Sequence, residues 1–214
     1  MLNIRQASLA WMMLTLSACS GNDPPARVQA PISNIVAFMG DSITQYWAVS
    51  DYDTTNPTVN LGIAGQTTVQ MLARFDAVLS SGAGVVVIEG GINDLYYLGP
   101  TVANTDSIAK MAAEAKAAGI RVIIASLLPD FYAYPAGVGY PPQSGDILAM
   151  NEALMKLCSD NGYLYADYYD EFLNADGTVN KSLYLDGLHP DADGYAVMWK
   201  VLQPLLNEEL QTMP

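Results

Sequence analysis

Short apolar runs of strand length recur along the chain and do not alternate in polarity. Most are rich in β-branched residues, and they lie at 34–39, 58–61, 85–89, 121–126 and 163–167. A continuous apolar run of this kind is typical of a strand that is covered on both faces of a sheet. The pattern therefore predicts five buried parallel strands.

Segments with helical spacing separate these runs. Apolar positions follow the helical period at 71–79 and at 108–118, and Gly119 is a fitting stop for the second helix. A last helix is predicted from Asp191 towards Leu210, bent or broken at Pro204. This β-α-β-α order predicts an α/β protein, a three-layer α/β/α sandwich around a parallel sheet.

The N-terminus has the features of an export signal. Arg5 precedes an apolar stretch at 7–16 that is too short to span a bilayer. The tetrapeptide Leu-Ser-Ala-Cys at 16–19 resembles the bacterial lipobox, which implies lipidation of Cys19 and, with Ser20 next to it, a place in the outer membrane. Ordinary cleavage after Ala18, giving a periplasmic or secreted protein, is the alternative. We predict a signal at 1–18, a polar, proline-containing tether at 19–31 and one domain at 32–214.

Composition narrows the classes of function. The chain of 214 residues has 51% hydrophobic and 14% charged residues, which is typical of a packed globular protein. Its formal net charge of -13 would repel a phosphate backbone, so we expect no nucleic-acid partner.

Cysteine and histidine are scarce. With Cys19 acylated, only Cys158 remains, and it lies on an apolar helical stripe that predicts a buried thiol. One histidine without a cysteine cluster gives a metal site almost nothing to build on, so we expect no metal.

Polar motifs follow each predicted strand. Gly-Asp-Ser at 40–42 follows the first, two glycines at 62 and 65 the second, and Gly-Ile-Asn-Asp at 91–94 the third. An aromatic stretch at 129–145 follows the fourth strand, and Asp186 and His189 come after the fifth. The carboxyl ends of parallel strands share one edge of a sheet, so we expect one site there.

The only histidine is the natural candidate for a general base, because an unperturbed imidazole titrates near neutrality. Ser42, on a strand-to-helix turn, is the candidate nucleophile, and Asp186 would orient His189. Read alone, Ser42 could be a simple helix cap and His189 a structural histidine.

Two further positions could donate hydrogen bonds to a substrate oxygen. Glycine permits close backbone approach, so the Gly65 N–H is one candidate; the alternative is a plain turn capped by Thr67. The Asn93 side-chain amide is the other, and the alternative is a turn-forming asparagine.

Together these motifs resemble the four blocks of the SGNH hydrolases, also called GDSL lipases and esterases, from about Ile35 to His189. The resemblance implies a flavodoxin-like five-stranded fold with Ser42 as nucleophile, Asp186 and His189 completing a triad. It also implies an oxyanion hole from the Ser42 and Gly65 N–H groups and the Asn93 side chain. Ile43 stands where the family nickname has leucine.

The stretch at 62–75, Gly-Ile-Ala-Gly-Gln-Thr-Thr followed by Met-Leu-Ala-Arg-Phe, is similar to the bacterial branch that resembles platelet-activating-factor acetylhydrolase. This implies a serine ester hydrolase acting on short acyl, acetyl-type esters of a small molecule or glycan, without a cofactor or protein partner. The alternatives are a lysophospholipase or thioesterase for longer chains and a non-catalytic glycan-binding envelope lipoprotein.

Overall fold

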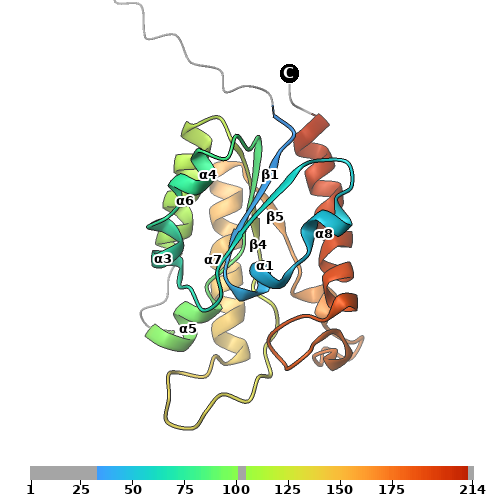
Figure 1. The fold of residues 1–214 in the computed structure, drawn as a ribbon. Coiled ribbons are helices and arrows are strands. Elements are labelled where there is room, and N and C mark those ends of the chain that lie inside the picture. Colours follow the sequence, from blue (N-terminus) through green and yellow to red (C-terminus); the bar gives the residue numbers. More distant parts are fainter. Residues whose placement is uncertain (1–32, 101–104, 212–214) are drawn as a thin grey trace, which may run out of the picture.

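Five parallel strands form a single sheet in the order β2-β1-β3-β4-β5 (Figure 1). The structure is a computed structural model that describes residues 33–100 and 105–211. All five strands lie within one or two residues of their predicted positions: β1 Val36–Gly40, β2 Thr58–Gly62, β3 Val85–Ile88, β4 Arg121–Ala125 and β5 Leu164–Ala166. The predicted α/β class and the parallel sheet are confirmed.

The apolar character of the strands reflects burial on both faces. Along β1, Ala37 and Met39 pack into one core, and Val36 and Phe38 pack into the other. Each of these four residues is at most 1% exposed. A strand between two helical layers has no polar face, which is why its sequence does not alternate.

Helices cover both faces of the sheet. One layer contains α3 (Thr68–Leu72), α4 (Asp76–Leu79), α6 (Asp106–Ala117) and α7 (Ser144–Asn161). The other contains α8 (Ala192–Gln211) with α1 (Ser42–Tyr46) and α2 (Val49–Tyr52) near the edge at β2. A further helix, α5 (Ile92–Leu98), follows β3. The result is the predicted three-layer sandwich.

Two helical predictions need correction. The segment 71–79 is not one helix: α3 ends at Leu72, a turn follows, and α4 begins at Asp76. Conversely, Pro204 does not break the last helix, because α8 continues through it. Leu202 and Leu206, on either side of Pro204, are at most 2% exposed, and their burial holds the helix together across the missing backbone donor.

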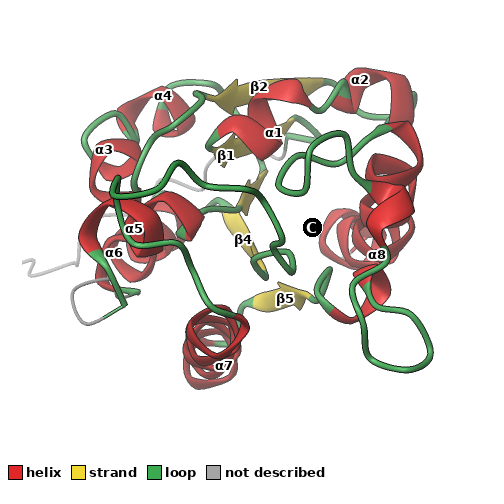
Figure 2. Ribbon diagram, turned by 90° about the horizontal axis from the view of Figure 1, so that it is seen from below, coloured by secondary structure: helices red, strands yellow, loops and turns green. Residues whose placement is uncertain are grey.

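The direction in which successive strands are added to the sheet reverses between β1 and β3, although all five strands run parallel. From β1 the chain crosses to β2 at one edge, whereas β3, β4 and β5 build the sheet outward in the other direction. In sheets of this order, ligands bind outside the carboxyl ends of the strands at that switch point. Figure 2 looks onto this edge, where α1 and α5 begin beyond β1 and β3.

The environment of Cys158 is as the sequence predicted. Its side chain is 2% exposed and packs in the same core as Ile147, Met150 and Leu154. In the described ranges no helix is both long and apolar enough to cross a membrane. The predicted signal at 1–18 and tether at 19–31, including Cys19, lie outside these ranges.

Candidate active site

Ser42, His189 and Asp186 form a chain of hydrogen bonds across 147 residues of sequence. His189 Nε2 lies 2.9 Å from Ser42 Oγ, and His189 Nδ1 lies 2.8 Å from Asp186 Oδ2. The two imidazole nitrogens thus face a hydroxyl and a carboxylate, which is the arrangement that activates a serine nucleophile.

The turn at residues 40–42, between β1 and α1, is shaped by Asp41. Ser42 is the first residue of α1, and the cap of this helix is Asp41, whose Oδ1 accepts a hydrogen bond from the Ile43 N–H at 3.0 Å. The simple cap interpretation of Ser42 is therefore wrong, and its hydroxyl is available to His189. Tyr195 on α8 braces the same turn, because its hydroxyl donates to the Ile43 carbonyl at 2.9 Å.

Asp186 is fixed by the loop that carries it. Its Oδ1 accepts hydrogen bonds from the Leu188 and His189 N–H groups at 3.0 and 2.9 Å. Partial burial alone would raise the pKa of Asp186, but the hydrogen bonds from His189 and Leu188 outweigh it and lower the pKa. Asp186 is therefore an ionised acceptor with little rotational freedom, suited to holding one imidazole tautomer.

Gly65 lies at the turn after β2 with φ +75°, a left-handed conformation that favours glycine. No heavy atom lies within 4 Å of the position a Cβ would take there, so backbone conformation rather than crowding explains the glycine. Within the described part of the chain, the N–H groups of Gly65 and Ser42 donate to no protein acceptor. Thr67 does cap α3, in a capping box with Gln70, so the helix cap that the alternative interpretation of this turn expected is present as well.

Asn93 is the second residue of α5, so it is helical and not the turn former of the alternative interpretation. Its Nδ2 donates to Asp41 Oδ2 at 3.1 Å and to the Gln66 carbonyl at 3.0 Å. Because both partners are acceptors, the Asn93 side chain must point its NH2 group and not its oxygen toward them, which fixes the orientation of the amide. The structure thus joins Asn93 to the turn at residues 40–42 and to the Gly65 loop. Donation by Asn93 to a substrate oxygen would require one of these two hydrogen bonds to be exchanged.

Two carboxyl groups are buried at and behind the turn that carries Ser42. Asp41 is 0% exposed, and burial raises its pKa to about 6 even though hydrogen bonds from Ile43 and Asn93 favour the charged form. Burial and the nearby charge of Asp41 raise the pKa of Glu89 well above its usual range, against one hydrogen bond from Thr44 Oγ1. The folded protein therefore favours the protonated form of Glu89.

We expect Glu89→Gln to flatten the dependence of stability on pH. Because the pKa of Glu89 is higher in the folded than in the unfolded chain, its contribution is complete below the unfolded pKa of about 4.3 and is lost as pH rises through the folded pKa. The free energy of unfolding should therefore fall between about pH 5 and about pH 8 more steeply in the wild type than in the variant. Denaturant titrations at both pH values measure this. Glu152→Gln, at an exposed position on α7, is the control, and parallel losses in all three proteins would contradict the prediction.

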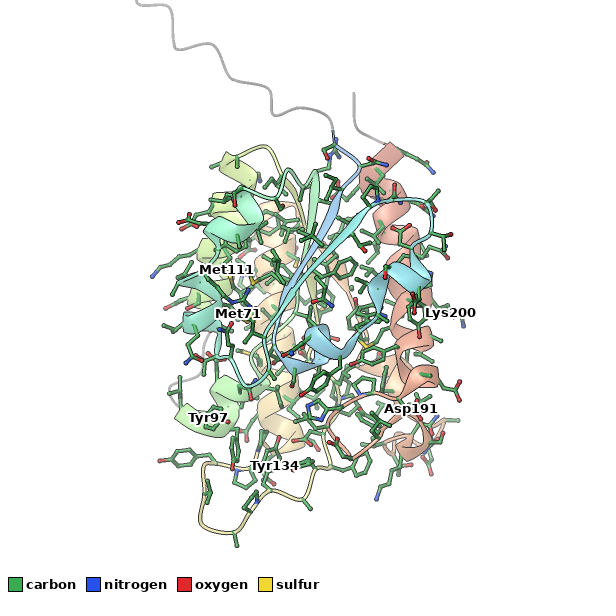
Figure 3. The ribbon with its side chains drawn as sticks, viewed as in Figure 1. Met71, Tyr97, Met111, Tyr134, Asp191 and Lys200 are labelled. Carbon is green, nitrogen blue, oxygen red and sulfur yellow. The ribbon has the colours of Figure 1, made fainter. Side chains whose placement is uncertain are left out.

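Aromatic side chains surround the site. Tyr46, which is 54% exposed, meets the His189 ring edge-on with centroids 5.4 Å apart. The 129–145 loop is tied to the segment that carries Asp186 and His189 by the Phe131 N–H, which donates to the Gly187 carbonyl at 3.1 Å. Tyr134 of this loop stacks on Tyr96 of α5 with centroids 4.5 Å apart, and Figure 3 shows Tyr134 and Tyr97 at the same end of the molecule.

Three polar residues of this site were missed as individual candidates. Glu89 ends an apolar strand, and a carboxylate in such a position is itself a signal, because buried carboxyl groups are rare. Gln66 and Arg74 lie in a stretch that sequence analysis considered only as a motif, and their contacts with the site depend on loops that the pattern does not position. Across 33–100 and 105–211, no group of three or more potential metal ligands occurs.

The sequence profile of the GDSL-like lipase/acylhydrolase family matches residues 38–197. This match spans β1 to α8 and includes all five predicted site residues. A search of curated proteins gave no significant match.

Solved structures resemble the chain over most of its length. A GDSL-like lipase from Bacteroides thetaiotaomicron is 30% identical, with a TM-score of 0.70 over 82% of this chain and 88% of that one. A protein from Streptococcus pneumoniae described as a platelet activating factor is 24% identical, with a TM-score of 0.67 over 84% of this chain and 86% of that one. An acetylxylan esterase from Geobacillus stearothermophilus is 17% identical, with a TM-score of 0.64 over 83% of this chain and 94% of that one.

Proposed function

Because this chain belongs to the GDSL-like lipase/acylhydrolase family and is a carboxylic ester hydrolase, we propose that Ser42 is its nucleophile, His189 its general base and Asp186 the residue that orients the base. The hydrogen-bonded chain from Ser42 Oγ through His189 to Asp186 carries this proposal. No other histidine exists in the sequence to take the role of base.

In the proposed reaction, Ser42 Oγ attacks the ester carbonyl carbon while His189 Nε2 takes the hydroxyl proton. The tetrahedral intermediate collapses to an acyl-serine, and His189 returns the proton to the leaving alcohol. A water molecule, deprotonated by His189, then attacks the acyl carbon. As the bond from Ser42 Oγ to this carbon breaks, His189 returns the proton to Oγ and the carboxylic acid is released. Asp186 stabilises the imidazolium in both halves through its contact with Nδ1.

The proposed oxyanion hole consists of the Ser42 and Gly65 N–H groups and the Asn93 side chain. The two N–H groups support this assignment because neither donates to another group among the described residues. Asn93 would release Asp41 or the Gln66 carbonyl as the oxyanion forms. Such a donor typically contributes on the order of 3 kcal/mol to transition-state stabilisation.

The proposed substrates are short acyl esters, of acetyl type, on a small alcohol or glycan. The similarity of residues 62–75 to the branch that resembles platelet-activating-factor acetylhydrolase supports this choice. A series of p-nitrophenyl esters from acetate to palmitate tests it, with Ser42→Ala as the blank for each ester. We expect kcat/KM to be highest for acetate and to fall by at least about tenfold by octanoate. A maximum at octanoate or longer would instead favour a lysophospholipase or thioesterase.

The proposed location is the bacterial cell envelope, with an acyl anchor on Cys19 in the outer membrane. The described chain enters β1 at Val36, and Ser42 follows the opposite end of that strand. A tether at 19–31 would therefore join the fold at the edge away from the site. Membrane fractionation of the full chain and of Cys19→Ala tests the anchor, and a wild type that is released with the soluble envelope proteins would refute it.

A further inference from the structure

Arg74 reaches two of the loops that form the site. It lies in the turn between α3 and α4, and its half-buried guanidinium donates from Nη2 to the Gly40 carbonyl at 3.1 Å. Its Nε donates to Gln66 Oε1 at 2.6 Å. Among the residues that the structure describes, no carboxylate lies within ion-pair distance of Arg74. The contacts of this cation are therefore with the loops of the site and not with a charged partner.

The acceptors of Arg74 are close in sequence to the two backbone donors. Gly40 precedes Ser42 by two residues, and Gln66 directly follows Gly65. The Gly40 carbonyl also accepts a hydrogen bond from the Ile63 N–H at 3.1 Å, so the turn at residues 40–42 and the loop after β2 meet at this oxygen. One guanidinium thus spans the two segments whose N–H groups would bind the oxyanion.

The third donor belongs to the same network. Asn93 Nδ2 donates to the Gln66 carbonyl at 3.0 Å and to Asp41 Oδ2 at 3.1 Å. The contacts therefore close a ring, which runs from Arg74 through Gln66, Asn93 and Asp41 to Gly40 and back to Arg74. Within this ring each of the three donor segments is held by two different contacts.

We infer that Arg74 is a positioning residue that sets the spacing of the three oxyanion donors, an inference that rests on the proposed function. Oxyanion donors act only when they lie about 2.7 to 3.1 Å from the developing charge, and a misplacement of about 1 Å costs on the order of 100-fold in rate. The planar fork of arginine offers several N–H groups at fixed angles and reaches both acceptors at once. Lysine, whose ammonium is a single point on a flexible stem, cannot reproduce this geometry.

The test compares Arg74→Ala and Arg74→Lys with the wild type on p-nitrophenyl acetate. We expect kcat to fall by on the order of 10- to 100-fold in both variants, with KM changed less than about threefold, because the donors act on the transition state and not on the bound ester. Methylguanidinium at millimolar concentration should restore part of the kcat of Arg74→Ala and leave Arg74→Lys unchanged. A residue that only stabilised the fold would lower the melting temperature without this split between kcat and KM.

Arg121→Ala is the matched control. Arg121 is also a partly exposed arginine, but it pairs with Glu209 at 2.8 Å and is the first residue of β4, so it lies at the amino ends of the strands, away from the site. We expect the Arg121→Ala variant to have a lower melting temperature and an unchanged kcat. Gln66→Met removes only one acceptor of Arg74, and we expect it to lower kcat severalfold and not additively with Arg74→Ala.

The outcomes separate the two proposals. If the wild type is active and Ser42→Ala is not, but folded Arg74→Ala keeps its kcat within about threefold, the Arg74 inference fails and the proposed function stands. If Ser42→Ala keeps activity, the proposed function fails. If Arg74→Ala does not fold, the Arg74→Lys and Gln66→Met variants test the inference instead. An unchanged kcat in both of them would overturn it.

Discussion

Replacing His189 by alanine is expected to abolish ester hydrolysis while the protein stays folded. His189 Nε2 lies 2.9 Å from Ser42 Oγ, and the chain has no second histidine that could replace it. Loss of the base or the nucleophile of a serine triad typically lowers kcat by about 10^6-fold. Ser42→Ala should have the same effect, because it removes only the attacking oxygen.

The measurement is kcat on p-nitrophenyl acetate, with circular dichroism and a thermal melt to verify the fold. The double variant should be no slower than either single variant, because the two residues act as one unit. A folded His189→Ala protein that kept more than about a tenth of the wild-type kcat would exclude His189 as the base.

Asp186→Asn is expected to lower kcat by about 10^4-fold through the wrong imidazole tautomer. The asparagine oxygen can keep the two backbone hydrogen bonds from Leu188 and His189, so its NH2 group takes the place of Oδ2 beside His189 Nδ1. That NH2 can only donate, so the proton of a neutral imidazole moves to Nε2. His189 would then donate to Ser42 Oγ and could not accept its proton.

Asp191→Asn is a matched control from the same segment. Asp191 Oδ1 accepts a hydrogen bond from the Gly194 N–H at 2.9 Å at the start of α8, and asparagine caps a helix about as well as aspartate. We expect this variant to keep its kcat and its melting temperature. An Asp186→Asn protein as active as Asp191→Asn would show that Asp186 does not orient the base.

The hydrophobic pattern alone was enough to predict where the five strands lie along the chain. A strand such as β1 is buried on both faces, so its sequence must be apolar throughout, and this requirement is visible without a structure. The pattern could not separate α3 from α4, because Met71, Phe75 and Val78 are buried in one core whether or not a turn interrupts the helix.

The positions of the motifs after the strands also predicted that five residues would lie at the carboxyl ends of the strands: Ser42, Gly65, Asn93, Asp186 and His189. Their proximity follows from a general property of parallel sheets, whose strand ends coincide, so the sequence order of the motifs was sufficient. The distances between these side chains could not be predicted from the sequence. The 2.9 Å contact between Ser42 and His189 depends on how the long segment after β5 folds back, and no local pattern encodes that path.

The sequence by itself thus determined the sheet, the layers and the residue types of the site, because burial and chemistry restrict which amino acids can occupy those positions. Tertiary structure alone decided which polar groups meet: Asn93 with Asp41, Glu89 with Thr44, and Arg74 with Gly40 and Gln66. These are contacts between side chains or carbonyl oxygens from different loops. Hydrogen bonds are short and directional, so such partners are fixed only when the whole fold has set the loops within a few tenths of an ångström.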